Sequence, residues 1–153
     1  MLDHADTRNV EIYAGLTSKV RANFSRRIAM EMAPLANAFA GKIVRDESEA
    51  SRPGTGSRII DLRIDHSEFG IGSCASCVKC EFTRPYACYA GCLAFEPWLD
   101  GPHEAALEYM LAQREYLNAT TDIRIASIND RAILGCAQVI RRCREIMDSE
   151  SND

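Results

Sequence analysis

Five of the seven cysteines of this 153-residue chain fall within one irregular stretch, residues 72–98. Their spacing is C-x2-C-x2-C-x7-C-x3-C, and they are Cys74, Cys77, Cys80, Cys88 and Cys92. This segment, which we call the cysteine stretch, has neither helical nor strand periodicity, and Gly, Ser and Pro interrupt it. Because such long irregular segments are uncommon inside compact domains, we expect disulfide bonds or a metal ion to hold it.

The sequence favours a metal ion over disulfide bonds. The number of cysteines is odd and no targeting signal is recognisable, so we expect a reducing, cytoplasmic compartment in which thiols stay free. Zinc binds four thiolates tetrahedrally, and closely spaced cysteine pairs supply them, which predicts a structural zinc ion. Two alternatives remain open: free cysteines that pack as small apolar groups, or a thiol redox sensor built on Cys74, Cys77 and Cys80.

The composition is that of an ordinary globular protein, with 46% hydrophobic and 26% charged residues. No apolar run approaches the roughly 20 residues that span a bilayer, so we expect no membrane association. The net charge of −4 is unevenly distributed. Residues 1–45 hold seven Lys or Arg against four Asp or Glu, whereas residues 46–153 hold eleven against eighteen. Only the first part is therefore suited to lie near phosphate groups, and charge alone leaves DNA binding undecided.

Within residues 1–45, the sequence predicts an amphipathic helix that starts near Thr17 and ends at Gly41, with a break before Pro34. Its apolar positions recur every three or four residues: Val20, Phe24, Ile28, Met32, Leu35 and Phe39. Residues 46–57 are small and polar and include Pro and Gly, which predicts a linker. The predicted organisation is therefore residues 1–45, a linker over 46–57, a unit over 58–147 and a disordered tail over 148–153.

The second part predicts one strand and two helices. Residues 58–65 alternate Ile60, Leu62 and Ile64 with charged side chains, which is typical of a half-buried strand. A helix begins after Gly101 and is broken at residues 120–122. The last helix carries apolar residues from Ile125 to Ile146 at helical spacing, with Cys136 and Cys143 as core residues. The two helices predict an antiparallel helical hairpin in a mainly α fold.

A second stretch with chemical potential lies near the start, where His4 and Tyr13 stand nine positions apart. Physically this is a weak signal, because a tyrosine at the end of a short helix usually packs with its hydroxyl at the surface. The arrangement of Leu2, His4, Val10 and Tyr13 nevertheless resembles the end of the catalytic domain of tyrosine recombinases, the phage-integrase family. The following segment is similar to the post-tyrosine helix of that family, including residues 33–36 and 39–41.

Downstream, the chain resembles a cysteine-containing C-terminal extension of some bacterial integrase-like proteins. The matching motifs are Gly72-Ser73-Cys74, Ala87-Cys88-Tyr89, Phe95-Glu96-Pro97-Trp98-Leu99-Asp100-Gly101-Pro102-His103-Glu104 and Ile128-Asn129-Asp130-Arg131-Ala132-Ile133-Leu134. The resemblance thus covers most of the chain. It favours Cys74, Cys80, Cys88 and Cys92 as the zinc ligands, with Cys77 as an alternative. One residue more than in the family separates the last two cysteines.

The resemblance implies DNA strand transfer through a 3′-phosphotyrosine at Tyr13, with His4 contacting the phosphate. The family supplies two arginines, a lysine and a further histidine upstream of this motif, and these 153 residues do not include them. We therefore expect the C-terminal part of a site-specific integrase from a mobile genetic element, inactive alone. The implied partners are DNA and other integrase protomers or co-encoded recombination proteins. The alternative is a zinc-bound module that binds DNA or protein without catalysis.

Overall fold

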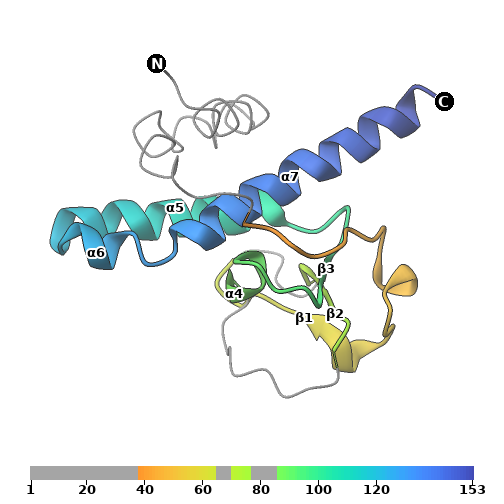
Figure 1. Ribbon diagram of the computed structural model, residues 1–153, viewed down its shortest axis with the longest axis horizontal. Coiled ribbons are helices and arrows are strands. Elements are labelled where there is room, and N and C mark those ends of the chain that lie inside the picture. The colour runs from red at the N-terminus through yellow and green to blue at the C-terminus, as the bar shows by residue number, and fades with distance from the viewer. Residues whose placement is uncertain (1–37, 65–69, 77–85) are drawn as a thin grey trace.

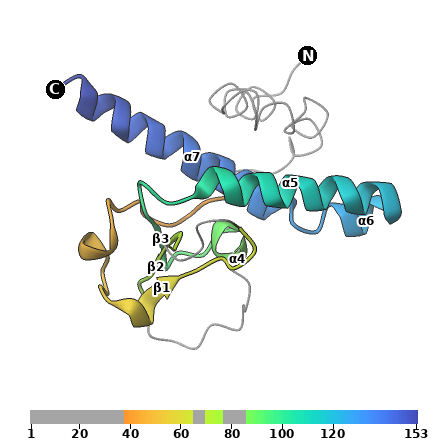
Figure 2. The same ribbon diagram turned by 180° about the vertical axis from the view of Figure 1, so that it is seen from behind.

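The computed structural model describes residues 38–64, 70–76 and 86–153. In this part of the chain, helices α5–α7 lie along one side and a small sheet with helix α4 lies along the other (Figures 1 and 2). The elements in order are η1 (Glu47–Glu49), η2 (Thr55–Ser57), β1 (Arg58–Ile59), β2 (Gly72–Cys74), α4 (Tyr86–Tyr89), β3 (Phe95–Pro97), α5 (His103–Thr120), α6 (Ile123–Ala126) and α7 (Asp130–Ser151). The described residues are thus partly helical, with a small sheet beside the helices.

The cysteine stretch contains regular structure that its sequence does not reveal. Strands β2 and β3 lie at its two ends and pair antiparallel, and β1 pairs with β2, so the sheet order is β1-β2-β3. Each of these strands has two or three residues, too few to display an alternating pattern. The expectation of an entirely irregular stretch was therefore wrong.

The strand predicted over residues 58–65 is also shorter than expected, because only Arg58 and Ile59 belong to β1. After them the chain turns, and Asp61 is 1% exposed whereas Leu62 is 84% exposed, the reverse of the predicted pattern. The Asp61 carboxylate accepts hydrogen bonds from the backbone N–H of Arg63 at 3.1 Å and from its Nε at 2.7 Å. This local bonding stabilises a turn in place of a strand.

Residues 46–57 do not form the free linker that their composition predicts. Ala50 is buried, and Ser51 donates hydrogen bonds from its backbone N–H and its hydroxyl to the buried carboxylate of Glu96 in β3, at 2.9 and 2.5 Å. The preceding residues also join the core, since Ala38 and Phe39 belong to the same hydrophobic cluster as the helices. Residues 38, 39, 50 and 51 therefore pack with the rest of the described chain.

The part of residues 17–41 that the structure describes is not helical. Residues 38–40 have no regular structure, although Phe39 was predicted on a helical stripe, and Gly41 does not cap a helix there. A Cβ atom at Gly41 would lie 2.0 Å from the carbonyl oxygen of Phe95, so this chain passes directly against β3. The rest of the predicted helix, including Pro34, lies outside the described residues.

The two long helices pack against each other as predicted, and α5 ends at Thr120 where the break was expected (Figure 1). The last helix, however, does not begin near Ile125. The Asp122 side chain caps the short helix α6, a turn follows, and α7 starts only at Asp130. Ile125 and Ile128, which the helical spacing placed on the apolar face of the last helix, are therefore 49% and 73% exposed.

Helix α7 continues to Ser151, so most of the tail predicted as disordered is helical. Figure 2 shows its C-terminal turns extending beyond α5. An ion pair between Arg45 and Glu150 tethers this end to the chain before η1. Among the described helices, none combines the length and apolar character needed to cross a bilayer.

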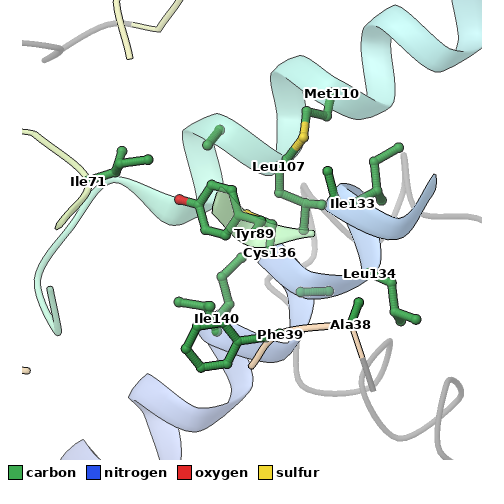
Figure 3. Packing of buried hydrophobic residues seen from close by; sticks show 14 of the residues in the cluster. Ala38, Phe39, Ile71, Tyr89, Leu107, Met110, Ile133, Leu134, Cys136 and Ile140 are labelled. Carbon is green, nitrogen blue, oxygen red and sulfur yellow. The ribbon is translucent and has the colours of Figure 1, made fainter. Parts of the chain in front are cut away.

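The core lies where α4, α5 and α7 meet (Figure 3). Its fully buried side chains include Tyr89, Phe95, Leu107, Leu111, Ile133, Leu134 and Val139. Cys136 and Cys143 are buried on α7, which confirms their prediction as core residues. Seven residues of helix place their Cα atoms about 10 Å apart, too far for a disulfide bond between them.

Candidate metal centre

Three of the five clustered cysteines lie in the described residues, each on a different element. Cys74 ends β2, Cys88 lies in α4, and Cys92 lies in the turn between α4 and β3. Cys74 is the antiparallel partner of Phe95, whose backbone N–H donates to the carbonyl oxygen of Cys92 at 3.3 Å. The backbone of Phe95 therefore brings Cys74 and Cys92 to the same end of the β2–β3 pair.

The side chains of these three cysteines are half-buried. Cys88 and Cys92 pack against the hydrophobic core, and the Cys74 thiol lies 3.6 Å from the carbonyl oxygen of Ser76. Partial burial keeps these sulfur atoms near the surface, in contrast to Cys136 and Cys143. Burial raises the pKa of the Cys143 thiol to about 11, so its thiolate is harder to form than that of an exposed cysteine.

The described cysteines do not form a metal site by themselves. Within residues 38–64, 70–76 and 86–153, no group of three or more His, Cys, Asp or Glu side chains is placed to hold a metal ion. Cys77 and Cys80 lie in residues 77–85, outside the described part, between the end of β2 and the start of α4. A site with four cysteines from this stretch would therefore need at least one of these two residues.

A buried polar network lies beside these cysteines and was not predicted. The Tyr89 hydroxyl in α4 and Nδ1 of His103, the first residue of α5, are 2.8 Å apart. On the other side of the ring, His103 Nε2 is 2.7 Å from the carbonyl oxygen of Trp98. The Cys136 thiol in α7 donates to the carbonyl oxygen of His103 at 3.2 Å. The network thus joins α4, α5 and α7 at one point.

These contacts fix the proton positions of the network. A carbonyl oxygen only accepts hydrogen bonds, so His103 carries its proton on Nε2 and donates it to Trp98. Its Nδ1 then accepts the hydrogen bond that the Tyr89 hydroxyl donates. Burial lowers the pKa of His103 to about 4, which keeps the ring neutral near pH 7. Burial also raises the pKa of Tyr89 well above its usual value and raises that of Cys136.

This network has a structural role. Tyr89, His103 and Cys136 are almost fully buried, so they are closed to substrate in this arrangement. Tyr89 follows Cys88 directly, and its anchorage to His103 therefore fixes the position of α4 and of the Cys88 backbone. No periodic pattern predicts such a contact, because the two residues are 14 positions apart in the sequence.

The two residues assigned to catalysis, His4 and Tyr13, lie outside the described residues, so their mutual geometry is not part of this site. Comparisons of the chain with protein-family models, with curated proteins and with solved structures gave no match.

Proposed function

We propose that this chain is the C-terminal part of a site-specific tyrosine recombinase, in which Tyr13 is the nucleophile and His4 contacts the phosphate under attack. The observation that carries the proposal is the spacing of Leu2, His4, Val10 and Tyr13. The basic balance of residues 1–45, which suits a segment that lies near DNA phosphates, supports it.

In this proposal the Tyr13 phenolate attacks a DNA phosphodiester, forms a 3′-phosphotyrosine and releases a 5′-hydroxyl. A phenol with a pKa of about 10 is a weak nucleophile near pH 7, and charge develops on the phosphoryl oxygens as the bond forms. Several cations around the phosphate are needed, both to favour the phenolate and to stabilise the charge on the phosphoryl oxygens. These 153 residues do not include the family's upstream arginines and lysine, so the chain by itself is proposed to be inactive.

The cysteine stretch is proposed to bind a structural zinc ion through Cys74, Cys80, Cys88 and Cys92, with Cys77 as the alternative ligand. Bound zinc would cross-link the stretch, and four thiolate ligands leave no open position for a reacting water. The fold positions two of these proposed ligands. The β2–β3 pairing fixes Cys74, and the hydrogen bond of the neighbouring Tyr89 fixes Cys88.

Covalent trapping on a nicked DNA substrate tests the catalytic part of the proposal. We expect no adduct from the 153-residue chain and a phosphotyrosine adduct when an upstream tyrosine-recombinase catalytic segment is joined to it. Tyr13→Phe should abolish the adduct, whereas Tyr116→Phe, which changes an exposed tyrosine on α5, should leave it unchanged. Failure of every joined chain to form the adduct would refute the recombinase proposal.

A second candidate function, a zinc-bound interaction module without catalysis, is favoured by one surface feature. The end of the helical hairpin exposes four large apolar side chains, which are Tyr116, Ile123, Ile125 and Ile128. Exposed apolar clusters of this kind are typical of protein-binding surfaces. Absence of the trapped adduct, together with an interaction that Ile125→Ser and Ile128→Ser weaken, would favour this candidate over the recombinase.

A further inference from the structure

The chain reaches helix α7 at Ala38 and Phe39, where one side-chain atom binds both residues. The Oε1 atom of Gln138 accepts the backbone N–H groups of Ala38 and of Phe39, each at 2.9 Å. Both residues are buried, so their amide groups would otherwise lack a partner in an apolar surrounding. Gln138 therefore replaces, at this point, the hydrogen bonds that regular secondary structure would supply.

Two further residues on the face of α7 around Gln138 contact this chain. Gly135 lies beside the chain, because a Cβ atom there would be in van der Waals contact with the backbone nitrogen of Phe39, at 3.5 Å. The guanidinium group of Arg142 lies 5.1 Å from the centre of the Phe39 ring, a cation–π contact. Residues 135, 138 and 142 are three and four positions apart, so they share one face of the helix.

The opposite side of the same segment is held by β3. Lys42 donates its backbone N–H to the carbonyl oxygen of Phe95 at 3.1 Å, and Val44 donates to that of Pro97 at 3.0 Å. The Phe39 ring also packs edge-on against the ring of Phe95, with centroids 6.3 Å apart. Residues 38–44 are therefore fixed between the strand and α7.

We infer that Gln138 is a positioning residue, which fixes the point at which the chain before Ala38 joins the C-terminal unit. The functional consequence rests on the recombinase proposal: the segment before Ala38 carries Tyr13, so Gln138 would couple the nucleophile-bearing segment to the helical hairpin.

Amide hydrogen exchange in the full 153-residue chain tests the contact itself. Gln138→Leu removes the acceptor, and we expect exchange at Ala38 and Phe39 to become about tenfold faster, the effect of losing about one net hydrogen bond. Gln138→Glu retains a side-chain acceptor and should restore slow exchange near pH 7. Gln113→Leu is the matched control, since it makes the same change at an exposed position of α5. Exchange at the wild-type rate in Gln138→Leu would overturn the inference.

A second measurement keeps the test valid if Gln138→Leu does not fold. In Gln138→Glu a charged carboxylate replaces the neutral amide oxygen, and charged acceptors form shorter, stronger hydrogen bonds. The amide proton resonances of Ala38 and Phe39 should therefore both move downfield, and the resonances around Gln113 should not. Unchanged resonances at both residues would contradict the contact.

The functional consequence is tested separately, in the chain joined to an upstream catalytic segment. Gln138→Leu should lower the yield of the Tyr13 adduct about tenfold, whereas Gln138→Glu and Gln113→Leu should retain the yield, an effect of about 1.4 kcal/mol. Faster exchange with an unchanged adduct yield would show that Gln138 does not position the nucleophile. If no joined chain forms the adduct, the recombinase proposal fails, and hydrogen exchange still decides whether the contact exists.

Discussion

The hydroxyl of Tyr89 donates a hydrogen bond to Nδ1 of the buried His103 across 2.8 Å, and this contact joins the cysteine stretch to the helical hairpin. The opposite ring nitrogen of His103 donates to the carbonyl oxygen of Trp98 at 2.7 Å. Both nitrogens of the neutral ring are therefore satisfied, whereas protonation would place a second N–H against the Tyr89 oxygen in a site without solvent. The fold thus depends on an uncharged His103.

Stability should consequently decrease as the solution is acidified. The pKa of His103 is lowered from 6.5 to about 4 in the folded chain, mainly by burial. Between these values the unfolded chain binds a proton that the folded chain does not, so the free energy of unfolding falls as the pH is lowered from 6.5 towards 4. The contribution of neutral His103 to the free energy of unfolding is fully present above pH 6.5. About 2–3 kcal/mol of this contribution is lost by pH 4.5.

Urea denaturation of the wild type and of His103→Gln at pH 7.5 and 4.5 measures this effect. The difference in unfolding free energy between the two proteins should shrink by about 2–3 kcal/mol on acidification, because glutamine does not titrate. Carboxyl groups contribute similarly to both proteins. A difference that is independent of pH would mean that His103 titrates normally in the folded chain.

Gly135→Ala should destabilise the protein, although alanine usually stabilises a helix interior by about 0.5–1 kcal/mol. A Cβ atom at this position would lie 1.9 Å from the backbone carbonyl oxygen of Tyr89, which cannot move without shifting α4. We expect a loss of about 1–3 kcal/mol in unfolding free energy, measured by urea denaturation. Gly56→Ala is the control, since nothing lies within 4 Å of the added atom, and a gain in stability for Gly135→Ala would contradict the close packing.

Arg114→Met should cost about 3–5 kcal/mol of unfolding free energy, because it leaves the buried carboxylate of Asp130 without its cation. The Arg114 guanidinium donates to both carboxylate oxygens, at 2.7 and 3.1 Å. Arg124→Met, which removes an exposed ion pair with Asp122, should cost less than about 1 kcal/mol. The double variant Arg114→Met/Asp130→Asn should recover part of the loss, and equal costs for the two single variants would refute the role of burial.

Cys88→Ser should reduce the zinc content of the protein purified under reducing conditions, and a chelator should lower the melting temperature of the wild type. Cys143→Ser should leave the metal content unchanged, because its thiol is buried in the core of the helical hairpin. Elemental analysis and thermal denaturation measure the two effects. A zinc-free protein that melts identically with and without chelator would rule out the structural zinc ion.

The local features of the helical hairpin could be predicted from the sequence, because each depends on neighbouring residues. The spacing of apolar residues placed Cys136 and Cys143 in the core, and the break at residues 120–122 ended α5 as expected. The same reasoning extended α7 back to Ile125, since periodicity alone does not show that Asp122 caps a separate short helix. The candidate metal ligands also follow from the sequence, because the cysteines cluster within one short stretch.

Only the tertiary structure decided how the remaining segments are held. Strands of two or three residues are too short to show an alternating pattern, so the sequence did not predict the sheet within the cysteine stretch. Residues 46–57 have the composition of a linker, yet Ser51 is fixed by a carboxylate 45 positions away, and Gln138 binds the amide of Ala38 across 100 positions. Contacts between distant residues depend on how the chain returns on itself, and composition and local spacing do not encode that path.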